Sequence, residues 1–450
     1  MKINGLLLRS AIVAALGGFL FGFDTAVISG TTDALKNVFA LTNLSLGFTV
    51  ASALIGTIMG AIFIGRPADI FGRHIMLIVS AVFYFVSAVG CGFAWDWYSL
   101  LFFRFLGGLA VGGASVVSPM YIAEISPARV RGRLVAITQF NVVLGILLAF
   151  FSNYVIANMS LGDIGWRWMF GVEAFPAAVF FFLLFSIPPS PRWLIAWNMI
   201  DRARNVLNKL GTDTDSVEEE IAAIKTSLDV EHHSLQERFY CRKYAMPIML
   251  AVLIAMFNQL SGINALMYYA PQIFKMAGAG VNSALLQTVA VGGTNLLFTM
   301  FALAIIDHFG RRNLMLVGSI GYIVSLSTVA WAFFHYNRDF NSAGSAIVLC
   351  GLLLFIASHA FGQGAVIWVF ISEIFPNRVR ARGQALGSFT HWFMCAIVSW
   401  AFPVVASISG GYAFTFFAAM MVMQLLFVIF LMPETKGITL EQIQKKLRIE

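Results

Sequence analysis

The stretch Ile122-Ala-Glu-Ile-Ser-Pro-Ala-Arg-Val-Arg131 returns later in the chain as Ile371-Ser-Glu-Ile-Phe-Pro-Asn-Arg-Val-Arg380. The Glu, the Pro and both Arg keep the same register in the two copies. Upstream of each copy lies a second matching pair, Asp69-Ile-Phe-Gly-Arg73 and Asp307-His-Phe-Gly-Arg311. Proline-containing segments at 188–191 and 432–434 follow the two copies. The chain is therefore predicted to be an internal duplication of two similar halves.

The sequence between these motifs is too apolar for a soluble protein. Of its 450 residues 59% are hydrophobic and 11% are charged, whereas a soluble domain carries about 25% charged residues. A membrane span needs roughly 20 apolar residues, and about twelve stretches satisfy this length. They lie near 9–30, 46–65, 75–94, 99–120, 134–156, 167–187, 245–272, 282–305, 313–334, 345–371, 383–406 and 411–431.

The expected fold class is an all-α membrane protein with twelve transmembrane helices in two six-helix halves, joined by short cytoplasmic linker helices. The expected division is an N-terminal half at 1–190, a helical linker at 191–243, a C-terminal half at 244–432 and a tail at 433–450. Parallel repeats of this kind are a transporter design, in which the substrate site lies near the midplane between the halves.

The basic residues predict the orientation. Most of the 29 Lys and Arg residues fall at the N-terminus, in alternate loops, in the 191–243 linker or after Pro433. Because cytoplasmic loops carry the excess of Lys and Arg, both termini are expected in the cytoplasm of a cell with this protein in its inner (plasma) membrane. The net charge of +7 is thus explained by topology, and no nucleic-acid partner is expected.

The repeated motifs place acids beside arginines at the ends of spans. Ion pairs between helices there are expected to close the cytoplasmic side in one state and to separate in the other. The alternative is that the basic residues only set the topology. The gating candidates are Asp69, Arg73, Glu124 and Arg131 in the first half, and Asp307, Arg311, Glu373 and Arg380 in the second.

Four further motifs resemble those of the sugar porter family of the major facilitator superfamily. They are Gly22-Phe-Asp-Thr-Ala-Val-Ile-Ser-Gly30, Pro188-Pro-Ser-Pro-Arg-Trp193, Asn258-Gln-Leu-Ser-Gly-Ile-Asn264 and Pro433-Glu-Thr-Lys-Gly437. The resemblance covers essentially the whole chain and is strongest to bacterial proton-coupled xylose and hexose symporters. It implies the major facilitator fold. Pro189 stands where Glu is usual, which is expected to weaken one cytoplasmic contact.

Three charged residues, Asp24, Arg104 and Glu173, lie inside predicted spans. An ionisable residue in a span is expensive and is a functional candidate by default. Protonation of Asp24 would release Arg104 from a buried pair, which makes a simple proton switch. The resemblance implies that Asp24 and Arg104 carry proton coupling and that Glu173 assists. The alternative is a permanent ion pair that only orients helices.

A neutral sugar needs groups that both donate and accept hydrogen bonds, together with aromatic surfaces for its ring faces. Asn258, Gln259, Asn264 and Tyr268 cluster near Gly262, while Asn295 lies in the eighth span and Gln139 opens the fifth. By resemblance these amides match the family's sugar-binding residues, and Trp368 and Trp392 match its site tryptophans. His359, His391 and Cys395 depart from the pattern. The histidines either bond sugar hydroxyls or are packing residues.

The sequence therefore predicts a secondary active transporter that imports a monosaccharide such as glucose or xylose with a proton, by alternating access and as a monomer. A facilitative uniporter is the nearer alternative, and a non-transporting sugar sensor is the more distant one. No His-Glu-x-x-His motif or phosphate loop occurs, and the cysteines have no metal spacing. We expect neither enzymatic activity nor a cofactor or metal.

Overall fold

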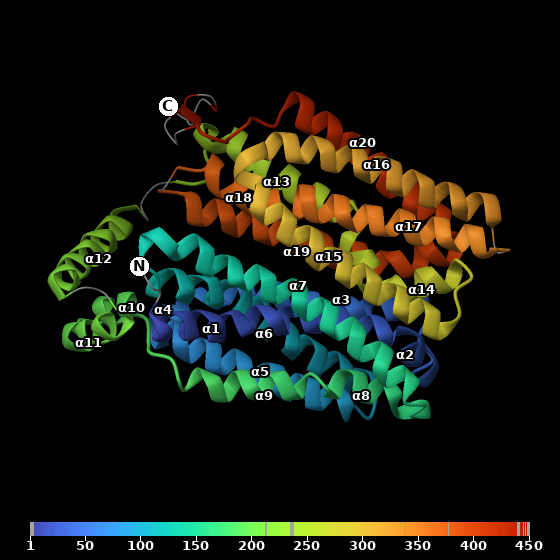
Figure 1. Cartoon of the computed structure of the whole chain (residues 1–450), viewed down its shortest axis with the longest axis horizontal. Coiled ribbons are helices and arrows are strands. Elements are labelled where there is room, and N and C mark those ends of the chain that lie inside the picture. Colours follow the sequence, from blue (N-terminus) through green and yellow to red (C-terminus); the bar gives the residue numbers. More distant parts are fainter. Residues whose placement is uncertain are drawn as a thin grey trace. The chain divides into compact units, whose positions relative to one another are not determined.

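A computed structural model describes residues 4–211, 214–234, 238–337, 339–376, 378–438, 442–443, 445 and 447. Every assigned secondary-structure element in this described part is helical (Figure 1). In chain order the elements are α1 Gly5–Val27, η1 Ile28–Gly30, α2 Thr32–Val38, α3 Asn43–Phe63, α4 Gly65–Phe71, α5 Arg73–Gly92, α6 Trp97–Ile125, α7 Ala128–Asn158, η2 Gly162–Ile164, α8 Gly165–Gly171, α9 Ala174–Leu184, α10 Pro191–Ala196, α11 Ile200–Leu210, α12 Thr214–Ser234, η3 Arg242–Tyr244, α13 Ala245–Leu260, α14 Ile263–Met276, α15 Val281–Phe309, α16 Arg311–Tyr336, α17 Ser342–His359, η4 Ala360–Gly364, α18 Ala365–Ile374, α19 Arg380–Ile408 and α20 Gly410–Phe430.

The described residues contain 12 helical segments that are long and apolar enough to cross a membrane. Each overlaps one of the stretches expected from the sequence, so the prediction of a twelve-span, all-helical membrane protein is confirmed. Large apolar side chains such as Phe63, Phe182 and Phe430 remain exposed on these helices. Lipid is the solvent that such a surface requires.

Two of the interrupted spans break beside candidate sugar-site residues. The span Arg242–Met276 breaks where α13 ends, and Gly262 adopts the left-handed conformation with φ 87° before α14 begins. A side chain there is disfavoured on backbone grounds alone. The span Ser342–Ile374 contains the π-helical turn η4 between α17 and α18. Such turns are rare and occur frequently at functional sites.

The chain divides into two compact units, each with its own packing. The first comprises Met1–Thr25, Ile55–Ala149 and Arg167–Gln236, and the second comprises Ala26–Leu54, Phe150–Trp166 and Glu237–Glu450. Within the first, α5 packs against α6 and α9. Within the second, α16 packs against α17 and α20, and α13 packs against α19.

The short linker helices expected from the sequence are α10, α11 and α12, drawn in green in Figure 1. Ser190 caps α10 by accepting the N–H of Trp193, and Pro191 occupies the first turn, where its missing N–H costs nothing. Amphipathic α11 buries Val206 and Leu210 in the same apolar cluster as the membrane helices of the first unit. The linker is therefore packed onto that unit.

Candidate functional site

The first unit holds a buried ion pair. Nη1 of Arg104 on α6 donates to Oδ1 of Asp24 on α1 at 2.8 Å, and the two residues are 2% and 4% exposed. The Arg104 guanidinium also lies over the ring of Phe170, 5.7 Å from its centroid. Glu173 is likewise buried, and its Oε1 has no hydrogen-bond partner among the described residues.

Local sequence explains how α6 brings Arg104 to Asp24. Asp96 and Ser99 form a capping box that fixes the start of α6. One turn beyond Arg104, a Cβ on Gly107 would lie 2.4 Å from Ser87 Oγ and 3.5 Å from Asp24 Oδ1. The clash with Ser87, and not the ordinary contact with the carboxylate, disfavours a larger residue there. Removing one partner of a buried pair leaves an uncompensated charge, which costs roughly 3–5 kcal/mol.

The second unit gathers the candidate amides at the break in the seventh span. Asn264 Nδ2 donates to Gln259 Oε1 at 2.8 Å, and Gln259 Nε2 donates to Asn258 Oδ1 at 2.9 Å. The same Gln259 nitrogen lies 3.2 Å from Nδ1 and 3.3 Å from Nε2 of His391 on α19. Asn258 and Gln259 are fully buried. The residues expected from Asn258-Gln-Leu-Ser-Gly-Ile-Asn264 therefore form one hydrogen-bonded group.

Two predicted site tryptophans adjoin this group through His391. Its ring centroid lies 5.2 Å from that of Trp368 on α18 and 4.9 Å from that of Trp392. Trp368 keeps 38% of its surface exposed. An aromatic surface beside a set of amides is the combination that a sugar ring requires.

The remaining candidate sugar-binding residues lie outside this hydrogen-bonded group. Asn295 Oδ1 on α15 accepts from Thr299 at 3.4 Å. His359 Nδ1 and the Tyr322 hydroxyl lie 2.6 Å apart and share a hydrogen bond. Tyr268 is buried on α14. Gln139 lies on α7 in the first unit.

The motif residues of the first unit form a connected network. Arg73 bonds Asp69 through Nη1 and Glu124 through Nε, both at 2.9 Å. Glu124 also accepts from the hydroxyl of Ser190. Arg131 instead donates to the backbone carbonyl of Ser126 at 3.3 Å, because α6 ends there and its last carbonyls need donors.

The second unit contains a matching network, to which the carboxylate of Glu434 is added. Arg311 Nη2 bonds Glu373 Oε1 at 2.9 Å, and Thr435 donates to Glu373 Oε2 at 2.6 Å. Glu434 then accepts the backbone N–H groups of Arg311 and Arg312. The Nε atom of Arg380 is buried without a hydrogen-bond partner among the described residues, and the side chain of Asp307 lies outside what the structure describes.

Comparison with known proteins decides the family. The family model for sugar (and other) transporters matches residues 10–447. The chain belongs to this family. It is 38% identical to the D-xylose-proton symporter of Escherichia coli (strain K12) over 473 residues, covering 96% of this chain and 94% of that one. It is 37% identical to the glucose transport protein of Synechocystis over 448 residues, covering 96% and 95%.

A solved structure agrees with this assignment. The major facilitator superfamily proton:xylose symporter XylE bound to 6-bromo-6-deoxy-D-glucose superimposes with a TM-score of 0.81 at 36% identity, covering 99% of this chain and 100% of that one. The expected major facilitator fold is confirmed. This sugar transporter family member is a multi-pass membrane protein and not an enzyme. The described residues contain no group of three or more His, Cys, Asp or Glu side chains able to hold a metal.

The transporter also contains polar residues that sequence reasoning missed. Gln363 on η4 and Gln424 on α20 are fully buried and bond each other, and Gln363 also accepts from Asn258 at 3.2 Å. Each is an isolated amide in an apolar span, a pattern more typical of helix packing. The only available signal was their position in otherwise apolar segments, and it does not reveal their partners.

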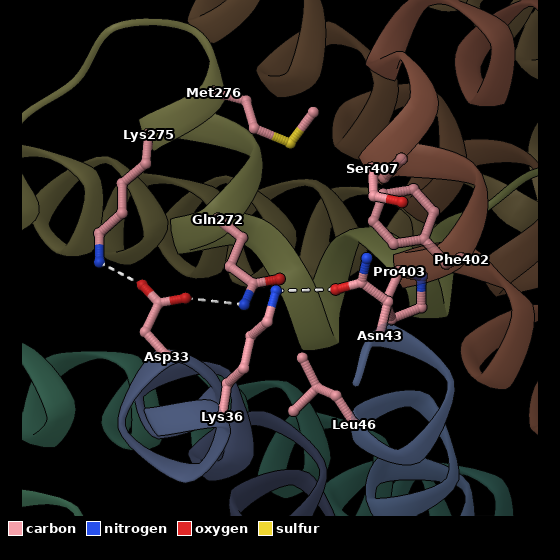
Figure 2. A pocket seen from close by; sticks show the side chains of 11 residues that line it. Asp33, Lys36, Asn43, Leu46, Gln272, Lys275, Met276, Phe402, Pro403 and Ser407 are labelled. Atoms are coloured by element: carbon pink, nitrogen blue, oxygen red, sulfur yellow. Dashed lines mark hydrogen bonds and ion pairs between the residues drawn. The ribbon is translucent and has the colours of Figure 1, made fainter. Parts of the chain in front are cut away.

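A second group of polar residues that the sequence did not reveal lines a cavity of about 260 Å³ in the second unit. Figure 2 shows its lining: Asp33 on α2 bonds Lys275 and Gln272 on α14, and Lys36 bonds Asn43 at 2.8 Å. Nearby, the indole of Trp400 on α19 donates to the carbonyl of Leu44 at 3.1 Å. Polar and aromatic contacts thus join α2 and α3 to α14 and α19.

Proposed function

We propose that this transporter imports a monosaccharide, a hexose or a pentose such as glucose or xylose, together with a proton by alternating access. The family assignment supports sugar transport. The relatives support the substrate class, since one is named for D-xylose-proton symport and another for glucose transport. Substrate binds from outside, Asp24 takes up a proton, and the two halves then rock to expose the sugar to the cytoplasm.

The observation that carries proton coupling is the Arg104–Asp24 bond of 2.8 Å between two fully buried side chains. Neutralising Asp24 removes the acceptor charge that holds Arg104, so a proton changes the contact between α1 and α6. Glu173 supplies a second buried carboxyl in the same unit. A buried carboxylate paired with an opposite charge is the kind of element that a proton can switch.

The sugar site is assigned to Asn258, Gln259, Asn264, Trp368 and His391, which the geometry brings together. Amides that donate and accept recognise hydroxyls, and the indole covers a ring face. Trp392, Tyr268, Asn295, His359 and Gln139 complete the proposed set of substrate residues. The candidate gate consists of Asp69, Arg73, Glu124 and Arg131 with Asp307, Arg311, Glu373 and Arg380.

We also propose where the protein lies in the cell and which parts of the chain move. Residues 1–190 and 244–432 act as the two moving halves, with the linker 191–243 and the tail 433–450 in the cytoplasm. Both termini face the cytoplasm of an inner (plasma) membrane, as the distribution of Lys and Arg indicates. The functional unit is a monomer.

The test is uptake of radiolabelled glucose and xylose into proteoliposomes, with and without an inward proton gradient. The proposal expects one of the two sugars to accumulate above its external concentration only when the gradient is present. Equal downhill flux under both conditions would make the protein a uniporter. Sugar binding without flux would make it a sensor.

A further inference from the structure

The sugar-site amides continue into a chain of buried amides that ends on the backbone. The chain crosses α14, α13, η4, α20 and α16 and lies entirely in the second unit. Its links run from Asn264 to Gln259, from Gln259 to Asn258, from Asn258 to Gln363, from Gln363 to Gln424, from Gln424 to Ser319, and from Ser319 to the carbonyl of Met315.

Every link in this chain points the same way. Each amide accepts with its oxygen from the preceding residue and donates with its nitrogen to the next. The final link fixes this direction, since the Ser319 hydroxyl donates its only proton to the carbonyl oxygen of Met315 at 2.7 Å. Ser319 can then only accept, and Gln424 turns its nitrogen toward Ser319 at 2.8 Å.

The direction then passes from residue to residue. Because the Gln424 nitrogen faces Ser319, its oxygen faces Gln363, and the Gln363 oxygen consequently faces Asn258. Asn258 therefore presents its nitrogen to Gln363 and its oxygen to Gln259. An isolated amide could rotate by half a turn and exchange donor for acceptor. Here a half turn would set two donors or two acceptors against each other.

Burial prevents the amides from reversing the direction of these hydrogen bonds. Gln259, Ser319, Gln363 and Gln424 are each 0% exposed and Asn258 is 2% exposed. Water cannot replace a broken link in such a place, so an unmatched amide carries its full desolvation cost. The π-turn η4 carries Gln363 in its fourth position, where the side chain bonds both α13 and α20.

We propose that Gln363 and Gln424 are positioning residues that determine which hydrogen-bonding atoms Asn258 and Gln259 present to the sugar. The inference rests on the proposed function, because it assigns these two residues to the sugar site. They act through Asn258 without touching the substrate. Their loss frees the site amides to rotate, which weakens binding and alters the preference between sugars with different hydroxyl arrangements.

The test compares uptake kinetics of xylose and glucose for the wild type and Gln424→Met, which keeps the length of the side chain and removes the amide. The variant is expected to raise KM about tenfold, the effect of one buried hydrogen bond, with Vmax nearly unchanged. The ratio of the two KM values is expected to change. Gln287→Met is the matched control, since Gln287 bonds only exposed Ser283 in the hydrogen bonds seen here, and it should leave both KM values unchanged.

Two further variants distinguish a loss of positioning from a folding defect. The double variant Gln363→Met/Gln424→Met removes both partners of one link and leaves the Asn258 nitrogen without its acceptor, in place of the Gln363 nitrogen. It should keep the raised KM, and its melting temperature, measured beside that of Gln424→Met, separates a positioning effect from a loss of stability. Gln424→Glu in its neutral form keeps an acceptor toward Gln363 and a donor toward Ser319, and it should restore a KM close to that of the wild type.

The outcomes separate this inference from the proposed function. If the wild type transports sugar while Gln424→Met and the double variant keep its KM values and their ratio, the positioning role is wrong and the transport function stands. A fall in Vmax and melting temperature with unchanged KM would likewise reduce both glutamines to packing residues. If the wild type neither binds nor moves any sugar, the proposed function fails and the inference fails with it.

Discussion

Oε1 of Glu434 accepts the backbone N–H of Arg311 at 3.0 Å, and the same carboxylate accepts that of the next residue, Arg312, through Oε2 at 3.0 Å. A side chain after the last span therefore caps the N-terminus of α16, where orphan N–H groups and the helix dipole favour an anion. Thr435 and Lys436 donate to the same carboxylate. This explains physically why Glu follows Pro in the segment Pro433–Gly437.

The cap predicts a pH-dependent contribution to stability. Burial acts to raise the pKa of Glu434, but hydrogen bonds from four backbone N–H groups outweigh it and hold the pKa below its ordinary value. A lowered folded-state pKa means that the stabilisation is present above the unfolded pKa of about 4.3 and is lost as the pH falls through the folded value. Glu434→Gln should destabilise by about 1 kcal/mol at neutral pH, and the difference should shrink below about pH 4.

Thermal denaturation in detergent at a series of pH values measures this effect. Glu219→Gln, on the exposed part of α12, is the control and should match the wild type throughout. An equal loss of stability for Glu434→Gln at every pH would show that the carboxylate charge contributes nothing.

The first half lacks the equivalent carboxylate. Ser190 donates to Glu124 as Thr435 donates to Glu373, so Pro189 corresponds to Glu434. A cavity of about 110 Å³ lies there against the start of α5, lined by Arg73, His74 and Pro189 among others. The cavity lies where the sequence leads us to expect a weakened cytoplasmic contact.

Pro189→Glu should fill this cavity and cap α5. A helix cap contributes about 1 kcal/mol, and the loss of proline rigidity offsets about 0.5 kcal/mol of it, so a small net stabilisation is expected. The denaturation midpoint in detergent measures it, with Pro189→Gln as the uncharged control of similar size. A midpoint at or below that of Pro189→Gln would contradict the predicted capping geometry.

The ion pair between Asp33 and Lys275 predicts a charge-reversal effect on transport. It joins α2 to α14 within the second unit, and the alternating access proposed above requires these two helices to part. The lysine and aspartate side chains are 30% and 45% exposed, and exposed pairs contribute roughly 0.2–1 kcal/mol. Lys275→Asp should therefore lower the maximal uptake rate by up to about fivefold.

Reversing both charges provides the control for that experiment. Asp33→Lys/Lys275→Asp restores the attraction and should recover most of the wild-type rate in the same uptake assay. A double variant as slow as Lys275→Asp would mean that the contact is incidental to transport.

Much of this architecture was predictable from the sequence, because a lipid environment imposes strict local rules. The apolar stretches predict the twelve spans, and the cluster of polar residues near Gly262 falls at the break between α13 and α14. The charges of Asp24 and Arg104 were so costly in their spans that a mutual pair was the simplest expectation, and the structure contains it.

What could not be predicted depends on how helices turn toward one another. Gln363 and Gln424 lie on different spans, and no sequence periodicity relates the rotation of α20 to that of η4. The residues of the π-turn include no proline or charged residue from which the turn could be predicted. Nothing in the sequence relates Lys275 to its partner Asp33, because the two residues are distant along the chain.

The most direct test of the central claim is sugar accumulation by Asp24→Asn in proteoliposomes with an inward proton gradient, alongside sugar exchange at equilibrium without a gradient. Asp163→Asn, on the exposed 3-10 turn η2, is the matched control. The account predicts that Asp24→Asn loses gradient-driven accumulation and still exchanges sugar, while Asp163→Asn does both. Gradient-driven accumulation by Asp24→Asn equal to that of the wild type would contradict the assignment of Asp24 as the proton site.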